Sequence, residues 1–340
     1  MRYGKFLNAG GTIGFVAPSF GCTTEPYRTA FVHTLEKFEK MGYSELIGPN
    51  CFKDDGIGIS TNPKDCAKEL VAYLTSGSAD VLVSCGGGEL MCEDLPFVDF
   101  DAIRKAPPKF FMGYSDNTNM TFLLPTVCDT AAIYGPCAAS FGMEPWDRAL
   151  EDALALLSGE KLAFESYPMF ELESLKDEEH PLVPYNLTEK RVLKAEGYEA
   201  PFSGRLLGGC LDCLSMLVGT KYDKVMEFND RYQEDGVIWF MEACDLNVFG
   251  IRRALWQMKE AGWFDTAKGF LIGRPRRFDE PEMGLDRHTA VTGILADLKG
   301  PILMDLDIGH LPPMMPLMCG SVGTVRVDGN DVKVEMKMIE

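Results

Sequence analysis

The sequence predicts an α/β fold, with an amino-terminal α/β domain built on a parallel sheet and a smaller carboxy-terminal α/β or barrel-like domain. Short apolar runs that end in glycine or a polar residue alternate with longer segments whose apolar residues recur at helical spacing. Strands that alternate with helices form parallel sheets joined by helical crossovers. The length of 340 residues suggests about two domains.

The first half of the chain supplies this alternation in order. Residues 12–18 form an apolar run typical of a buried strand, and residues 26–41 place Phe31, Leu35 and Phe38 on one face of a helix. Asn62 followed by Pro63 is typical of a helix start. The other elements expected in this half are strands at 80–85, 110–112 and 131–134 and helices at 117–127 and 146–157.

Residues 166–200 interrupt the alternation. Acidic side chains crowd residues 171–180, and Pro181 and Pro184 follow, so we expect a linker or an excursion that approaches the functional site. The chain is thus divided into a domain at 1–165, the excursion at 166–200 and a carboxy-terminal domain at 201–340. The elements expected in the last domain are strands at 237–242, 269–273 and 302–308, a helix at 248–261 and a hairpin over 324–338.

Charge and composition limit the partners. The net charge of −18 argues against binding to nucleic acid or to an anionic membrane, because both require a basic face. The first residues lack the apolar core of a signal peptide, and no apolar run is long enough to cross a bilayer. Most of the eleven cysteines lie inside apolar runs, Cys66, Cys85, Cys128 and Cys244 among them. We therefore expect a cytoplasmic protein with reduced thiols.

A serine at a sharp turn is the first candidate for chemistry. The run at 110–112 stops at Gly113, Ser115 follows, and a helix is expected from Asn117. A strand, a tight turn with serine at its tip and a helix make up a nucleophile elbow, although the second glycine of the usual G-x-S-x-G pattern is missing. The alternative is an ordinary polar turn that caps a helix.

A serine nucleophile needs a base and an orienting carboxylate. Of the four histidines, His310 alone follows an apolar strand directly, in a loop fixed by a glycine before it and two prolines after it. Glu242 closes the apolar run at 237–242, where an unpaired carboxylate would be costly. A structural loop histidine and a solvent-facing glutamate are the alternatives. Ser115, Glu242 and His310 all lie at carboxyl ends of strands, where α/β folds place active sites.

The glycine run at 86–88 follows the strand at 80–85. It lacks the pattern of a nucleotide-binding loop, so we expect the backbone N–H of Gly87 to form an oxyanion hole together with that of Asp116. Cys210 and Cys213 have C-x-x-C spacing but no second pair, so we expect no metal site. We also expect no cofactor.

The chain resembles the LD-carboxypeptidase family of serine peptidases, and its length and excursion are most similar to the microcin C immunity branch. The matching segments are Gly14–Ser19, Gly86–Gly88, Gly113–Asp116, Gly204–Gly209 with Gly219-Thr220, the strand ending at Glu242, and Gly309-His310. The resemblance implies a Ser-Glu-His triad at Ser115, Glu242 and His310, and often a homodimer.

Two positions depart from the family pattern. Cys210 stands where asparagine is common, and the excursion has tyrosines, Tyr185 among them, where the immunity branch places tryptophan to stack on a nucleobase. Gly88, Cys210 and Tyr185 are candidate substrate contacts. We therefore predict a serine peptidase or amidase that acts on a small peptide or an aminoacyl-nucleotide amide. A catalytically silent binding protein on the same fold is the alternative.

Overall fold

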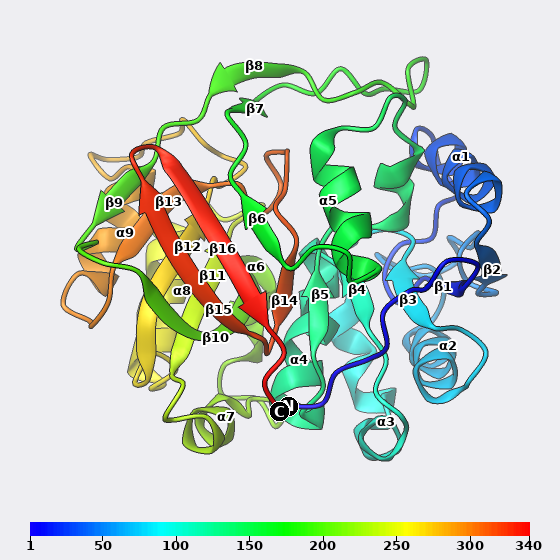
Figure 1. Cartoon of the computed structure of the whole chain (residues 1–340), viewed down its shortest axis with the longest axis horizontal. Helices are drawn as coiled ribbons and strands as arrows, with labels where there is room; N and C mark the ends of the chain where they lie inside the picture. The colour runs from blue at the N-terminus through cyan, green and yellow to red at the C-terminus, as the bar shows by residue number, and fades with distance from the viewer.

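A computed structural model describes residues 1–340 and contains two large β-sheets. Figure 1 shows the six-stranded sheet beside the eight-stranded sheet, with the small sheet of β7 and β8 running along one edge above both. The fold class predicted from the sequence is confirmed.

The six-stranded sheet has the order β14-β5-β4-β3-β1-β2. Its first five strands in the chain pair in parallel, as the alternation predicts. The sixth, β14, comes from near the carboxyl end of the chain and pairs antiparallel with β5. The bounds are β1 (Thr12–Val16), β2 (Ser44–Ile47), β3 (Val81–Ser84), β4 (Phe111–Gly113), β5 (Ala132–Tyr134) and β14 (Leu317–Cys319).

The helices of the first half agree with the expected segments to within a few residues. Asn62 caps α2 by accepting a hydrogen bond from the N–H of Asp65, as the Asn-Pro pair predicts. The bounds are α1 (Tyr27–Lys40), α2 (Pro63–Thr75), α3 (Phe100–Lys105), α4 (Thr118–Cys128) and α5 (Arg148–Leu157). Short 3-10 turns lie at η1 (Met91–Glu93), η2 (Leu95–Phe97), η3 (Ser115–Asn117) and η4 (Ala138–Gly142).

The eight-stranded sheet has the order β6-β16-β15-β10-β11-β12-β13-β9, with a parallel centre from β10 to β13. The strands are β6 (Ala163–Glu165), β9 (Lys194–Glu196), β10 (Phe202–Cys210), β11 (Val237–Glu242), β12 (Ala267–Gly273), β13 (Ile302–Leu306), β15 (Val322–Asp328) and β16 (Asp331–Lys337). The helices are α6 (Leu211–Leu217), α7 (Val225–Arg231), α8 (Val248–Glu260) and α9 (Arg287–Leu295). The expected hairpin is thus present as β15 and β16.

The excursion has more structure than its sequence indicates. It contains β7 (Met169–Glu171) and β8 (Leu187–Lys190), which pair antiparallel, and it also supplies β9 to the large sheet. β8 is exposed at all four positions, so its sequence carries no apolar alternation that could have revealed it.

One hydrophobic core joins the two sheets. A single cluster of 74 buried residues includes side chains from both, and α4 contacts β4 and β5 on one side and β10 on the other. Ten of the eleven residues of α4 are buried, including its polar residues Thr118, Asn119, Thr121 and Thr126. The helix that follows Ser115 is therefore fixed against both halves of the molecule.

All eleven cysteines are free thiols, and most are buried. Cys244 was expected in the core but is partly exposed, because it lies just beyond the end of β11 rather than within it. None of the helices has the length and apolar character needed to cross a membrane.

Candidate active site

Ser115 lies at a strained turn between β4 and α4. Its backbone φ is 62°, in the left-handed region that residues with a side chain seldom adopt. Gly113 makes the turn possible, since a Cβ there would lie 2.8 Å from the Cβ of Asn117. The Asn117 side-chain amide donates to the carbonyls of Gly86 and Tyr114, which ties the glycine run to the turn.

His310 lies close to this serine. Its Nε2 is 2.9 Å from the Ser115 Oγ, and its Nδ1 is 2.8 Å from Oε2 of Glu242. The Tyr114 ring packs against the imidazole, with ring centroids 5.1 Å apart. The three residues therefore form one hydrogen-bonded chain, although they come from the ends of β4, β11 and β13.

Glu242 ends β11 and is 1 % exposed. Its second oxygen, Oε1, accepts a hydrogen bond of 2.7 Å from the Tyr134 hydroxyl. Gly309 has a φ of 100°, and a Cβ on it would lie 2.4 Å from the Glu242 carboxylate, so only glycine leaves room there. Tyr134 is not among the site residues expected from the sequence; it lies at the end of the expected strand at 131–134.

Glu242 and His310 shift each other's pKa in opposite directions. Burial would raise the pKa of Glu242, but the facing His310 and the hydrogen bonds from His310 and Tyr134 lower it overall. Burial would lower the pKa of His310, but Glu242 and the nearby Cys244 raise it well above its ordinary value. The imidazolium is thus stabilised by the carboxylate that orients it.

Backbone groups of the glycine run approach Ser115. A Cβ on Gly87 would lie 3.3 Å from the Ser115 Cβ, and the Gly87 N–H has no acceptor within the protein. Gly88 packs against Ser19, whose hydroxyl donates to the carboxylate of Asp116. That carboxylate also accepts from the Met91 N–H, so the residue after the serine is firmly held.

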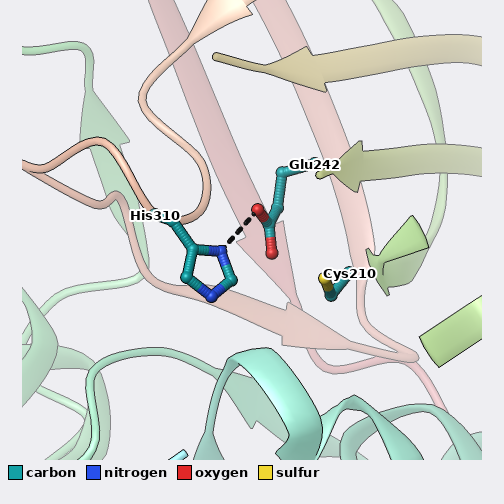
Figure 2. A group of neighbouring side chains, drawn as sticks. All are labelled: Cys210, Glu242 and His310. Atoms are coloured by element: carbon teal, nitrogen blue, oxygen red, sulfur yellow. Dashed lines mark hydrogen bonds and ion pairs between the residues drawn. The ribbon is translucent and has the colours of Figure 1, made fainter. Parts of the chain in front are cut away.

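Cys210 lies behind the acid rather than in the cavity. Figure 2 shows the Glu242 carboxylate between Cys210 and His310. Donor atoms of these three residues lie within 4.8 Å of one another, which makes them the one cluster that could hold a metal ion. Both Glu242 oxygens already accept hydrogen bonds, and the neighbouring Cys213 thiol and burial raise the pKa of Cys210 well above its ordinary value.

A cavity of about 480 Å³ opens beside His310. Tyr114, Gly309 and His310 line it from the site, and Tyr185 lines it from the excursion. Tyr185 of the excursion thus lies at the same cavity as His310. Gly88 and Cys210 do not line this cavity.

An α/β fold that joins a strained serine, a histidine and a buried carboxylate has the arrangement that serine hydrolases use. Models of the LD-carboxypeptidase amino-terminal and carboxy-terminal domains match residues 13–135 and 203–325. The chain belongs to the LD-carboxypeptidase family.

Similar proteins extend over the whole chain. The microcin C7 self-immunity protein MccF of Escherichia coli is 25% identical over 334 residues, which cover 96% of this chain and 94% of that protein. The solved structure of MccF with aspartyl sulfamoyl adenosine has a TM-score of 0.83 at 23% identity and covers 99% of both chains. An MccF-like protein from Streptococcus pneumoniae, solved with AMP, has a TM-score of 0.79 at 21% identity, with 96% and 98% covered. These structures share the fold of this chain.

Proposed function

We propose that this protein is a serine peptidase or amidase in which Ser115 is the nucleophile, His310 the base and Glu242 the residue that orients the base. The observation that carries the proposal is the unbroken hydrogen-bonded chain from Ser115 Oγ through both ring nitrogens of His310 to Glu242. The strained φ of Ser115 supports it, since strain of this kind clusters at active sites.

The reaction follows from this geometry. Glu242 accepts a hydrogen bond from Nδ1–H of His310, which leaves Nε2 unprotonated and able to take the Ser115 proton as Oγ attacks an amide carbonyl. The imidazolium then donates that proton to the leaving amine, and an acyl-serine ester forms. Water, deprotonated by the same nitrogen, releases the acyl group and regenerates the serine.

We propose that the N–H groups of Gly87 and Asp116 stabilise the negative oxygen of the tetrahedral intermediate. The support is the closeness of Gly87 to the Ser115 side chain and the free Gly87 N–H. Donors that are already fixed in place stabilise a developing charge without reorganisation. Tyr134 has a positioning role, since its hydroxyl donates to Glu242 and accepts a 3.5 Å hydrogen bond from the backbone N–H of Ser115, without touching the serine side chain.

The substrate that we propose is a small peptide or an aminoacyl-nucleotide amide. The family is named for carboxypeptidases, and solved relatives were crystallised with AMP and with an aspartyl sulfamoyl adenosine. A cavity of about 480 Å³ is of the size that small-molecule sites have. We also propose a homodimer, a cytoplasmic location and domain boundaries at residues 165 and 200. Sedimentation analysis would test the homodimer.

Labelling with a fluorophosphonate, followed by a hydrolysis screen, tests the chemistry. The wild-type protein is expected to be labelled on Ser115, and Ser115→Ala protein should stay unlabelled. The screen compares tetrapeptide muropeptides with aspartyl-adenylate analogues. If the probe does not label the wild-type protein and neither substrate class is hydrolysed, the proposed function is wrong.

A further inference from the structure

The cavity beside His310 is lined by two cationic side chains, Lys176 and Arg276. This is notable in a chain whose net charge is −18, since the protein as a whole repels anions. Lys176 comes from the excursion, between β7 and β8, and Arg276 follows β12. Positive charge from two separate parts of the chain therefore meets at the space next to the candidate base.

The ammonium group of Lys176 is partly buried but has no hydrogen-bond or salt-bridge partner in the protein. It lies 5.7 Å from the centre of the Tyr27 ring. Burial lowers its pKa, which reflects the cost of holding the charge there. Of the six other lysines that are not exposed, all but Lys53 have an oxygen acceptor: Lys37, Lys109, Lys161, Lys224 and Lys259.

The neighbouring charges compensate Lys176 only in part, because burial lowers its pKa by more than Glu171 raises it. Glu171 lines the same cavity, but its Oε2 accepts the N–H of Asn186 at 2.6 Å and no salt bridge joins it to Lys176. Arg276 lies 4.0 Å from Asp245 and is largely exposed. Lys176 is thus the cation of this cavity whose charge is left free to meet a ligand.

We propose that Lys176 binds an anionic group of the substrate, a carboxylate or a phosphate, at a position removed from the amide that Ser115 attacks. The inference rests on the proposed function and narrows it to substrates that carry such a group. A charged hydrogen bond made in a partly desolvated cavity is strong enough to set specificity. Arg276 adds positive charge to the same cavity.

Paired substrates test this assignment. The first pair is a tetrapeptide with a free terminal carboxylate and its carboxamide. The second pair is an aminoacyl phosphoramidate of adenosine, which carries an anionic phosphate, and the aminoacyl amide of 5′-amino-5′-deoxyadenosine, which does not. For Lys176→Gln we expect kcat/KM for the anionic member to fall roughly 10- to 100-fold, mainly through KM, with little change for the neutral member. The pair that shows this difference identifies whether the group is a carboxylate or a phosphate.

Two further variants serve as controls. Lys176→Arg keeps the charge and should restore most of the preference for the anionic member. Lys190→Gln removes an exposed lysine of β8 in the same excursion and should behave as wild type. Equal losses of Lys176→Gln on both members of each pair, or no loss on either, would overturn the assignment.

A binding measurement separates this inference from the proposed function. Calorimetry on Ser115→Ala protein, with and without Lys176→Gln, needs no turnover, and AMP and adenosine serve as probes beside the peptide pair. Weaker binding of the anionic probes alone supports the role of Lys176 even if the wild-type protein hydrolyses nothing. Unchanged affinity for all anionic probes contradicts it, whatever the activity.

Discussion

His310 Nε2 lies 2.9 Å from Ser115 Oγ although 195 positions separate the two residues in the chain. The contact spans the boundary between the two sheets, because Ser115 follows β4 and His310 follows β13. The distance between Ser115 and His310 therefore depends on how the two halves of the molecule pack.

Replacing Ser115 by alanine should abolish hydrolysis and leave the fold intact. The side chain is small and lies at a turn, whereas loss of a nucleophile costs roughly 10⁴-fold or more in kcat. Steady-state kinetics and thermal unfolding of Ser115→Ala protein check both parts. Near-normal turnover would show that another group attacks the substrate.

Glu242 and His310 should act as one unit. Glu242→Gln keeps the shape but removes the charge, and it should lower kcat by as much as about 10⁴-fold. Adding it to His310→Ala should then cost little more than His310→Ala alone, since residues of one unit are not additive. Kinetics of both single variants and the double variant decide this, and multiplicative losses would mean that the residues work independently.

Tyr134→Phe should reduce turnover without abolishing it. The change removes the donor to Oε1 of buried Glu242, and a hydrogen bond to a charged group is worth about 1.5–3 kcal/mol. We expect kcat/KM to fall roughly ten-fold and the free energy of unfolding to drop by about 1–3 kcal/mol. Tyr43→Phe is the matched control, because the Tyr43 hydroxyl forms no hydrogen bond; equal behaviour of the two variants would contradict the role of Tyr134.

Activity should rise with pH as His310 loses its proton, because only the neutral ring can accept the proton of Ser115. Glu242 and Cys244 raise the pKa of His310, so the midpoint should lie above the ordinary value of about 6.5. NMR titration of the imidazole in Ser115→Ala protein measures it. In Ser115→Ala protein that also carries Glu242→Gln, the pKa of His310 should be lower. An unchanged pKa would show that Glu242 does not raise the pKa of His310.

The same shift affects stability. Because the pKa of His310 is raised in the folded state, its contribution to the free energy of unfolding is fully present below the unfolded pKa and is lost as pH rises through the folded one. The pKa of Glu242 is lowered, so its contribution is present above the unfolded pKa and is lost as pH falls through the folded value.

Gly309→Ala should lower kcat/KM by more than an alanine substitution at another glycine with a positive φ. The new Cβ would lie 2.4 Å from Glu242 side-chain atoms, so the carboxylate must move away from His310. Gly284→Ala is the control, since Gly284 also has a positive φ, 84°, but open space around it. We expect a large loss of kcat/KM for the first variant and near-normal activity for the second.

The candidate site could be predicted to the extent that each residue follows an apolar run. Ser115, Glu242 and His310 each stand where such a run stops, and the carboxyl ends of parallel strands meet at one edge. Tyr134 also ends a strand, but an aromatic residue in an apolar run is ordinarily a core side chain. Its partner is apparent only once β5 and β11 are placed in space.

The parts of the fold that were missed are set by contacts distant in sequence. β14 is three residues long and pairs with β5 across more than 180 positions, so nothing local in Leu317–Cys319 reveals its partner. β7 and β8 lie in the segment expected to be irregular, because the exposed strand β8 needs no apolar alternation. The central helices and strands could be predicted because their buried faces require apolar residues at regular spacing or in short continuous runs.

The pairing of β14 with β5 also sets an order of events during synthesis. Until residues 317–319 leave the ribosome, the edge of β5 has no neighbour, and the loop that carries His310 has only just been made. The nascent chain thus presents an open strand edge through most of translation, which is the period of greatest risk of aggregation. Ser115 also cannot meet His310 before almost the whole polypeptide exists, so the proposed site is complete only after nearly complete translation.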